Sequence, residues 1–377
     1  MRLAVTIIFI GLFIAVAVGV LALFLSSFGQ GTGGDTEEAE GPTEAERIQI
    51  SHDGGKTFAA ATISSEAKKI LSSASPIALF EDSDVAGRWW LPTNAAIFLS
   101  QDTGASWDML RNEQNEMVSG ATAFAREPGS DTLYLANIVD DRGRIFRSDD
   151  LGKTFVEVFS AAQTKVTISA IAVDPAEHAH ILAGMSDGFS VVSRDRGNTW
   201  TTLGSFSGTI DRIVFSPKDP ASVFMTIVDK GLLYSGDRGE TWGNVDVANL
   251  SQFRGGNAIF DVSFFPGAAN QVLLATEAGL LASDDTGSFR LVGSLVVPPK
   301  SLPILSIVFN PRNAAEAYVT ARNGLYKSEN TGETWEVVRL SEDKDLRFVR
   351  MSRDIPQTVV LFLTPAAKEA KNQFRIF

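Results

Sequence analysis

Short runs of four to six apolar residues alternate with glycine, aspartate and proline turns along the chain from Arg47 onward. Residues 168–204 are the clearest example, because four such runs follow one another there and turn residues bound each of them. Apolar runs of this length between turn residues are typical of β-strands. The same order of four runs returns from residues 210, 259 and 304 and, more loosely, from residues 75 and 120. The pattern predicts an all-β protein built from four-stranded units.

A box of eight residues lies between the third and the fourth run of each unit. Its pattern is S-x-D-x-G-x-[ST]-[WF], and the sixth copy is one residue shorter. Four strands per unit and a period of about 45 residues are typical of β-propellers. We therefore expect a seven-bladed β-propeller with four-stranded blades. The seven copies begin 42 to 49 residues apart, at Ser51, Ser100, Ser148, Ser193, Ser235, Ser283 and Ser328.

Each recurring place in the box has a structural role. The carboxylate at the third place is expected to accept hydrogen bonds from backbone N–H groups one or two residues further on. Glycine at the fifth place permits a positive φ, and the final aromatic ring buries apolar surface under the hairpin. Because the last two boxes are degenerate, we interpret the box as structural and not catalytic. The residues with these roles are Asp53, Asp102, Asp150, Asp195, Asp237, Asp285, Asn330, Trp107, Trp200, Trp242 and Trp335.

The two ends of the repeat region complement each other. The first box has only a third and a fourth strand around it, whereas residues 346–365 supply a first and a second strand with no box after them. Joining these segments gives a seventh blade and closes the ring, which protects strands that would otherwise present open edges. Residues 373–377 also have a strand pattern and compete with residues 47–50 for the third place in this blade. The sequence leaves both assignments open.

The N-terminal region has a different character. Residues 3–25 are 23 consecutive uncharged, mostly apolar positions, and about 20 such residues span a bilayer as a helix. A cleaved signal peptide is the alternative, but its apolar region is shorter and ends in small residues. Arg2 precedes the segment and an acidic stretch follows it, so the N-terminus is expected in the cytoplasm and the propeller outside. We expect a signal-anchor transmembrane helix over 1–25, a disordered acidic tether over 26–46 and the propeller over 47–377.

Composition limits the classes of partner. The formal net charge is −12, and the propeller region remains acidic when the tether is set aside. Such a domain lacks the basic footprint of a nucleic-acid-binding protein. The chain has no cysteine, so it has neither disulfides nor thiolate metal sites nor a lipidated cysteine anchor.

Seven boxes of this pattern in one ring resemble the Asp-box (BNR) repeat proteins. The spacing and the expected extracytoplasmic anchor are most similar to the photosystem II stability/assembly factor family and to sortilin-like propellers, and the resemblance covers about residues 47–377. Those relatives bind folding intermediates or peptides and catalyse no reaction. The resemblance therefore implies an assembly factor or interaction scaffold without a cofactor, and its expected partner is a protein, such as a membrane complex or one of its subunits.

A sialidase-like hydrolase or a glycan-binding lectin on the same fold is the alternative. Sialidases use a tyrosine nucleophile, but the four tyrosines of this chain all lie in strand patterns, where packing explains them. Asp-box xyloglucanases place their catalytic aspartates between two propellers, and this chain has repeats for one. His178 and His180 lack an evident third metal ligand and are expected in a solvated turn. We therefore expect no metal and no small-molecule substrate.

A partner is expected on the face opposite the boxes. In a propeller, the loops between the second and third strands share that face with the loops between blades, and loops often carry function. Arginine and aromatic residues are frequent in interface hot spots. The three arginines beside box turns, Arg194, Arg196 and Arg238, are expected to face solvent, and at least one ring of the Trp89–Trp90 pair is expected in the core. The candidate partner-binding residues are Arg142, Arg144, Phe253, Arg254 and Lys300.

Overall fold

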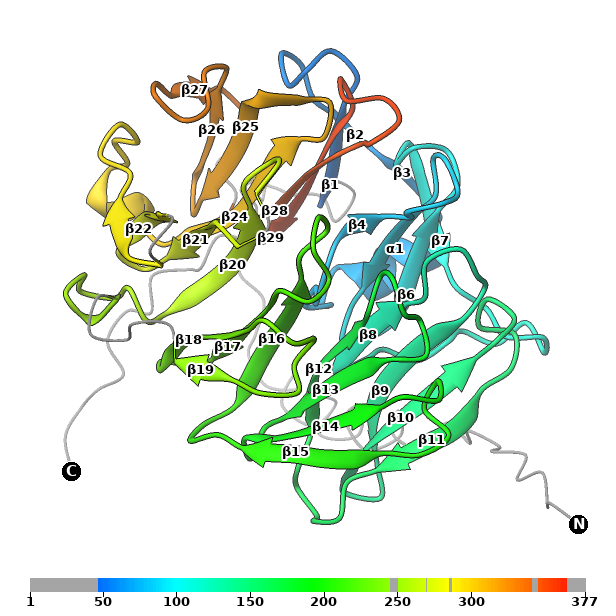
Figure 1. Ribbon diagram of the computed structural model, residues 1–377. Coiled ribbons are helices and arrows are strands. Elements are labelled where there is room, and N and C mark those ends of the chain that lie inside the picture. The colour runs from blue at the N-terminus through cyan, green and yellow to red at the C-terminus, as the bar shows by residue number, and fades with distance from the viewer. Residues whose placement is uncertain (1–46, 245–249, 269, 285–286, 341–344, 365–377) are drawn as a thin grey trace, which may run out of the picture. The chain divides into compact units, whose positions relative to one another are not determined.

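Seven β-sheets stand around a common centre in the computed structural model and form a seven-bladed propeller (Figure 1). The structure describes residues 47–244, 250–268, 270–284, 287–340 and 345–364, all within the unit Thr43–Phe377. The expected all-β class and blade number are confirmed. The first strands of neighbouring blades contact one another along β8, β12 and β16 and along β20, β24 and β28, so these strands line the centre.

Strand order follows the chain within six blades, blade 7 joins strands from both ends of the chain, and all neighbours in these four-strand meanders are antiparallel. We number the blades from 1 to 7, beginning with the blade that holds the second box. The blades are blade 1, β4 (Phe80–Glu81), β5 (Trp89–Pro92), β6 (Ile97–Ser100) and β7 (Ser106–Met109); blade 2, β8 (Ala123–Arg126), β9 (Leu133–Val139), β10 (Arg142–Ser148) and β11 (Val156–Ser160); blade 3, β12 (Ile168–Val173), β13 (Ile181–Met185), β14 (Phe189–Ser193) and β15 (Thr201–Ser205); blade 4, β16 (Ile210–Phe215), β17 (Val223–Ile227), β18 (Gly231–Ser235) and β19 (Gly243–Asn244); blade 5, β20 (Ile259–Phe264), β21 (Val272–Thr276), β22 (Gly279–Ser283) and β23 (Phe289–Leu291); blade 6, β24 (Ile304–Asn310), β25 (Asn313–Ala321), β26 (Gly324–Ser328) and β27 (Glu336–Val338); and blade 7, β28 (Asp345–Met351), β29 (Val359–Thr364), β1 (Ile48–Ser51) and β2 (Ala59–Ala60).

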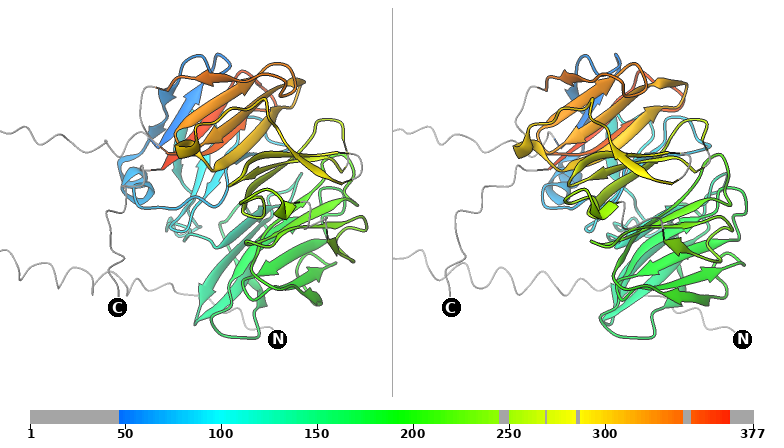
Figure 2. Two further views of the ribbon diagram at one scale, coloured as in Figure 1. Left: turned by 90° about the vertical axis from the view of Figure 1, so that its left-hand side faces the viewer. Right: turned by 60° about the vertical axis from the view of Figure 1, so that its left-hand side comes forward.

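Blade 7 is built from both ends of the described chain, as predicted. Strand β1 pairs antiparallel with β29, and the register runs from Ile48 opposite Phe362 to Ser51 opposite Val359. The blue and red segments lie side by side in every view (Figures 1 and 2). Strand β1 therefore fills the third place of this blade, and the competing segment 373–377 lies outside the described residues.

Two elements before blade 1 depart from the four-strand pattern. Strand β3 (Thr62–Ile63) adds a fifth, parallel strand outside β7, with Thr62 opposite Ser106. Helix α1 (Ser65–Leu71) follows it, and the Ser64 hydroxyl caps its N-terminus by accepting the Ala67 N–H. The helix buries Ala67 and Leu71, four residues apart, against the core between blades 7 and 1. These elements were not predicted because each is too short to show a period in the sequence.

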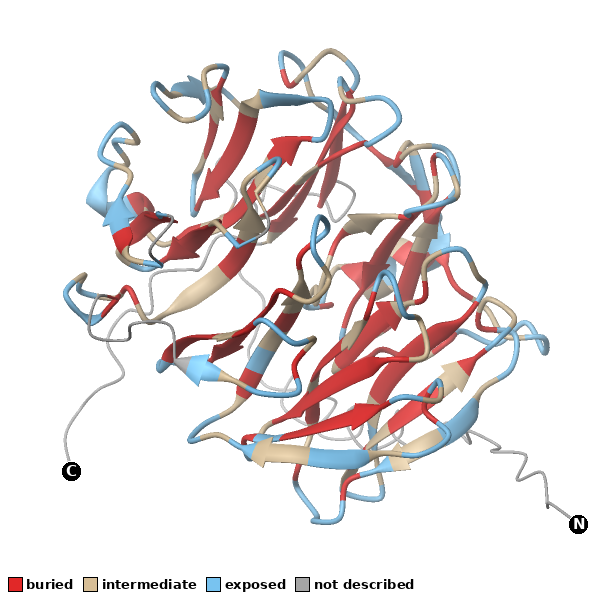
Figure 3. Cartoon of the chain, in the orientation of Figure 1, coloured by how far each residue is buried: buried red, intermediate tan, exposed pale blue. Residues whose placement is uncertain are grey.

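Hydrophobic clusters fill the spaces between adjacent blades. Each cluster contains side chains from two neighbouring sheets. A central strand is therefore buried on both faces, which is why the apolar runs are nearly continuous. Trp89 and Trp90 illustrate this, because both rings are fully buried, one in the cluster with blade 7 and the other in the cluster with blade 2. Burial is deepest in the second and third strands, and the outer fourth strands are more exposed (Figure 3).

The predicted transmembrane helix and tether, residues 1–46, lie outside the described residues. Among the residues that are described, the structure has no helix of the length and apolarity needed to cross a membrane.

Candidate functional site

The Asp-box closes the hairpin between the third and fourth strands around its own carboxylate. Ser148 Oγ donates to Asp150 Oδ1 (2.8 Å) and accepts the Gly152 N–H (2.7 Å). Asp150 Oδ1 then accepts the Thr154 N–H (2.8 Å), and Oδ2 accepts the Thr154 hydroxyl (2.6 Å). The prediction of donors one or two residues on was wrong. The donors lie four residues on, because positive φ values at Leu151 and Gly152 curl the chain around the carboxylate. The same bonds form at Asp53, Asp102, Asp195 and Asp237.

These hydrogen bonds keep the box carboxylates ionised. The Thr199 N–H and hydroxyl lower the pKa of Asp195, and the Ser193 hydroxyl adds to the effect. Burial raises the pKa of Asp150, but the bonds from Thr154 and Ser148 outweigh it and the pKa is lowered. A carboxylate that accepts this many hydrogen bonds and has a lowered pKa has the properties of a structural group, not of a general acid.

The degenerate boxes keep the hairpin in modified form. In the seventh box, Asn330 Oδ1 accepts the Thr334 N–H (2.9 Å) and Asn330 Nδ2 donates to the Thr334 hydroxyl (2.8 Å). In the shortened sixth box, Asp284 Oδ1 accepts the Ser288 N–H (3.0 Å), the same four-residue relation. Asp284 thus makes the contact that was assigned to Asp285, and Asp285 lies outside the described residues.

The box tryptophans close the same turn from the other side. Their indole N–H groups donate to the carbonyl of the fifth-place glycine at 2.9–3.1 Å in three boxes, those of Trp107, Trp200 and Trp335. Trp107 is buried and Trp200, Trp242 and Trp335 are half-buried. The indole N–H of Trp242 has no hydrogen-bond partner within the described residues. The burial predicted for the aromatic ring at the end of the box is therefore complete in one of the four tryptophans.

The fourth residue of each described box fastens the box to its own blade. Its N–H donates to a carbonyl in the turn between the first and second strands, or, for Ala315, near the start of the second strand, so both turns are held on one face of the ring. This confirms the face predicted for the boxes. The six bonds, all 2.8–3.1 Å, join Gly54 to Gln357, Thr103 to Gly87, Leu151 to Asp131, Arg196 to Ala179, Arg238 to Ala221 and Thr331 to Ala315.

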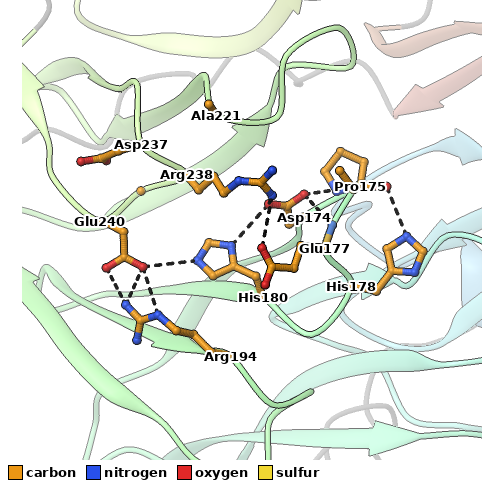
Figure 4. A network of polar contacts seen from close by, with 12 residues as sticks. Asp174, Pro175, Glu177, His178, His180, Arg194, Ala221, Asp237, Arg238 and Glu240 are labelled. Atoms are coloured by element: carbon orange, nitrogen blue, oxygen red, sulfur yellow. Dashed lines mark hydrogen bonds and ion pairs between the residues drawn. The ribbon is translucent and has the colours of Figure 1, made fainter.

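Arginines of the third and fourth boxes also connect neighbouring blades. Arg196 pairs with the buried Glu127 of blade 2 (2.6 Å), and Arg238 pairs with the buried Asp174 of blade 3 (2.5 Å). Arg194 pairs with Glu240 of the next box at 2.5 Å (Figure 4). Arg194 and Arg196 are exposed as predicted, but Arg238 is only half-exposed. All three guanidinium groups serve contacts between blades, which the sequence did not indicate.

His180 lies inside this network and not in a solvated turn, so that expectation was wrong. Its ring is buried between blades 3 and 4, 3.6 Å from Asp174 and 3.9 Å from Glu240 (Figure 4). Neither ring nitrogen has a hydrogen-bond partner among the described residues. Burial lowers the pKa of His180, against the opposing effect of Asp174 and Glu240. The described part of the chain contains no group of three or more residues that could hold a metal ion.

The five predicted partner-binding residues have different environments. Arg142 and Arg144 lie in strand β10 and not in the loop before it. Arg142 donates to the carbonyls of Ala161 and Ala162, and Arg144 pairs with Glu157 (2.7 Å) and Asp140 (2.9 Å). Phe253 is half-buried against the core between blades 4 and 5. Arg254 and Lys300 are exposed, and neither side chain has a polar partner among the described residues.

A stripe of exposed apolar side chains on the predicted partner face was missed. We call it the hairpin stripe, because its members flank the turns between the second and third strands of three successive blades. Ile138 is 48% exposed, Phe189 38% and Val228 45%. Phe189 follows Gly188, Val228 precedes Asp229, and Ile138 lies two residues before Asp140, so a search for apolar residues near hairpin turns could have found them.

Polar groups cross the centre of the ring. Asp261 of β20 is buried between Arg212 of β16 (3.4 Å) and Arg350 of β28 (3.2 Å). Ser306 of β24 donates to the same carboxylate (2.9 Å), and Arg350 also donates to the Leu79 carbonyl before β4 (3.0 Å). Burial raises the pKa of Asp261, but Arg350 and Arg212 outweigh this and lower it. The carboxylate is therefore held as an anion, which does not suit it for general acid catalysis.

Arg347, on the same strand as Arg350, gives this centre an excess of positive charge. Burial and the nearby Arg212 lower its pKa, while Asp261 and Asp211 oppose them. Its guanidinium has no hydrogen-bond acceptor or ion-pair partner among the described residues. We call the face with the turns between the second and third strands the hairpin face. Because the first strand of each blade begins on this face, Arg212 and Arg347 lie toward the mouth of the centre there. The guanidinium lies over the Phe348 ring, 5.2 Å from its centroid, and its N–H donors could still bind an anionic group of a ligand.

Comparison with known proteins agrees with this geometry. The model of the BNR-Asp box repeat matches residues 145–158, which contain the box at Ser148. No curated protein matches the chain significantly. Among solved structures, the GH74 xyloglucanase from Xanthomonas campestris superposes with a TM-score of 0.59 at 17% identity, over 78% of this chain and 52% of the enzyme. The chain therefore spans about half the length of that enzyme.

Two structures of YCF48 match over most of their length. YCF48 bound to a D1 peptide has a TM-score of 0.56 at 14% identity and covers 78% of this chain and 94% of its own. YCF48 from Cyanidioschyzon merolae has a TM-score of 0.51 at 14% identity, over 77% of this chain and 96% of its own. At these identities the likeness concerns the fold. The chain thus carries an Asp-box repeat on a seven-bladed β-propeller, a fold it shares with the YCF48 proteins and with the propellers of GH74 enzymes.

Proposed function

We propose that this chain is a protein-binding propeller that recognises an apolar, acid-containing segment of its partner on the hairpin face. The observation that carries the proposal is the hairpin stripe, in which three successive blades each expose a large apolar side chain. Contiguous exposed apolar patches mark interaction sites, and we propose that these three side chains act as one such patch. The similar structure of YCF48 with a D1 peptide supports a protein ligand for this fold.

Three cations in other blades and in the loops between blades give the proposed ligand its charge sign. Arg347 has no acceptor within the described residues, and Arg254 and Lys300 are exposed without a partner there. The chain as a whole has a net charge of −12, so these cations are local exceptions in an acidic protein. A carboxylate on the partner would satisfy them and set the orientation of the bound segment.

The test compares stripe variants with controls of similar exposure elsewhere. Ile138→Asp, Phe189→Asp and Val228→Asp remove the apolar contact. Val156→Asp and Val337→Asp change residues that are 62% and 64% exposed on outer strands. The full chain is tagged, cross-linked in its own cells and purified, and each co-purifying protein is quantified. We expect the stripe variants to lose one partner at least fivefold and the controls to retain it. Equal recovery from all five variants would contradict the proposal.

A carbohydrate-active role is the second candidate, because GH74 enzymes share the fold. The buried central acid, Asp261, does not favour this role, since two arginines and Ser306 engage its carboxylate. Purified full-length chain should therefore release no reducing sugar from xyloglucan and no product from a sialoside. Turnover of either substrate would replace the binding proposal by a hydrolase.

Membrane attachment through residues 1–25 belongs to the same proposal. It rests on the 23 uncharged positions of residues 3–25 and on the charge difference across them. The full chain should remain in the membrane pellet after alkaline extraction, and a protease added outside the cytoplasmic membrane should cleave it. Release into the alkaline supernatant, or protection of the whole chain from the protease, would count against an extracytoplasmic, anchored propeller.

A further inference from the structure

A cavity of about 440 Å³ opens between blades 5 and 6. Blade 5 supplies Leu273, Ala282 and Val292 to its lining, and blade 6 supplies Phe309, Ala317 and Trp335. These residues belong to the hydrophobic cluster between the two blades, so the cavity is an incompletely filled part of the core. Its volume lies within the range of roughly 300–1,000 Å³ that is usual for small-ligand sites.

The cavity lies beside the seventh box, where a contact between blades that recurs in five boxes is missing; the shortened sixth box, at Gly287, lacks it too. In five boxes, a Cβ placed on the fifth-place glycine would meet a side chain of the preceding blade at 3.3 Å or less, as with Leu182 against Gly239 at 2.6 Å and Tyr318 against Gly55 at 3.0 Å. At Gly332, in the seventh box, the three nearest atoms to such a Cβ, at 3.4–3.9 Å, all belong to Trp335 of the same box. Leu273 holds the strand position of Leu182 and Tyr318, but it does not reach Gly332.

The rim of the cavity carries one charge of each sign. Arg290 of β23 and Glu333 of the seventh box both line the opening. Both side chains are exposed, and neither has an ion-pair or hydrogen-bond partner among the described residues. Ser294 Oγ donates to the Gly332 carbonyl (2.6 Å) and ties the two sides of the rim together. The site therefore offers an aromatic and aliphatic interior with a free cation and a free anion at its mouth.

We propose that this cavity binds an aromatic amino-acid residue, with its ring inside against Trp335. A carboxylate beside the ring meets Arg290, and an ammonium or guanidinium group meets Glu333. Ring-to-ring packing favours an aromatic ligand over an aliphatic one in such a pocket, and a guanidinium fork recognises a carboxylate by two parallel hydrogen bonds. The cavity shares no residue with the hairpin stripe, so this proposal can be tested independently of the proposed partner face.

Three tryptophan derivatives separate the parts of this recognition. N-acetyl-tryptophan carries only the carboxylate, tryptophan amide only the ammonium, and N-acetyl-tryptophanamide neither. Binding to the full chain is measured by saturation-transfer NMR and calorimetry. We expect Arg290→Gln to weaken N-acetyl-tryptophan about two- to fivefold without changing tryptophan amide, and Glu333→Gln to do the reverse, as for exposed ion pairs. The peptide acetyl-Arg-Trp-Asp-amide tests whether the cavity binds the aromatic residue as part of a polypeptide. Tighter binding of this peptide than of all three derivatives would identify a peptide ligand. Weaker binding would identify a free amino acid.

Filling the cavity provides the control. Leu273→Tyr places a ring where Tyr318 and Tyr134 stand in other blades, and its hydroxyl should reach the Thr331 carbonyl as theirs reach Gly54 and Arg196. This variant should keep its fold by circular dichroism and lose binding of every probe. Ala317→Leu fills the same space from blade 6 and serves if the first variant does not fold. The proposal is wrong if no probe binds wild type at millimolar concentration, or if a folded filling variant binds as well as wild type.

Discussion

Arg350 of blade 7 and Asp261 of blade 5 form an ion pair of 3.2 Å across blade 6. The blades are not neighbours, so the contact runs through the centre of the ring, where Ser306 of blade 6 donates to the same carboxylate oxygen. Arg212 of blade 4 pairs with the other oxygen, and Arg350 also donates to the Leu79 carbonyl before blade 1. One buried carboxylate thus connects blades whose first strands would otherwise meet only side by side.

Asp261→Asn should lower the free energy of unfolding by about 3 kcal/mol. The substitution keeps the side-chain shape but leaves Arg212 and Arg350 without a counter-charge in a buried site, and breaking such a pair costs about 3–5 kcal/mol. Urea denaturation at neutral pH measures the loss. Asp211→Asn, at an exposed site one strand away, should change stability by less than about 0.5 kcal/mol. Equal losses in the two variants would show that Asp261 contributes nothing beyond overall charge.

Tyr318→Phe should weaken the closure of the ring. The Tyr318 hydroxyl, in blade 6, donates to the Gly54 carbonyl of the first box (2.6 Å) and so holds the N-terminal part of blade 7. Losing this hydrogen bond should cost about 1 kcal/mol. Tyr326→Phe is the matched control, because Tyr326 is also buried in blade 6 but its hydroxyl has no partner within the described residues. If closure depends on this bond, hydrogen exchange in β1 should speed up in Tyr318→Phe and not in the control.

The sequence predicted well what is local and repeated. The box spacing gave the blade number, and the incomplete repeats at the two ends gave the shared blade 7, because both depend on chain order alone. The contacts across the ring could not be predicted in this way. Arg196 and Glu127 are 69 residues apart, and Asp261 and Arg350 are 89 apart. Nothing in either neighbourhood marks the partner, so such pairs emerge only when the blades are in place.

The candidate site shows the same division. Sequence reasoning placed the boxes on the face opposite the loops between the second and third strands, since the order of strands fixes which loops share a side; the partner face itself stays a prediction. It chose Arg142 and Arg144 because arginine is frequent in interfaces, but the structure uses their guanidinium groups for contacts within blade 2. The hairpin stripe was missed because single apolar residues beside turns look like strand ends in a sequence. The cavity was missed because it lies where Leu273 does not contact Gly332, and only the assembled blades show this.

Asp150→Ala should destabilise the box hairpin by about 1–2 kcal/mol, since three hydrogen bonds from Ser148 and Thr154 end on its carboxylate. Asp150→Asn should be much milder, because Asn330 holds the equivalent hairpin of the seventh box with an amide. The lowered pKa of Asp150 also means that its stabilisation is present above pH 3.8 and is lost as the pH falls through the folded-state value. Thermal melts at pH 7 and pH 3 test both statements. An Asn variant as unstable as the Ala variant would show that the negative charge, and not the hydrogen-bond geometry, closes the turn.

His180 should make the contact between blades 3 and 4 weaker in mild acid. Two influences compete at its ring. Burial disfavours the charged form, whereas Asp174, Glu240 and Glu177 favour it, and Arg194 again opposes it. Arg238 already neutralises Asp174 (2.5 Å), and the edge of the Phe215 ring adds an apolar neighbour. The balance lowers the pKa of His180 in the folded protein below its ordinary value of 6.5.

The sign of the pH effect follows from this balance. Below pH 6.5 the unfolded chain binds a proton at His180 before the folded chain does, so stability falls as the pH falls toward the folded-state pKa, by at most about 1.4 kcal/mol per pH unit. His180→Phe removes the titrating ring and its two unpartnered nitrogens, so it should be at least as stable as wild type at pH 7.5 and show a shallower loss between pH 6.5 and 5. Urea denaturation of both proteins at several pH values gives the comparison. A wild type that becomes more stable over this range, relative to His180→Phe, would show that the three carboxylates outweigh burial and that protonated His180 ties the blades together.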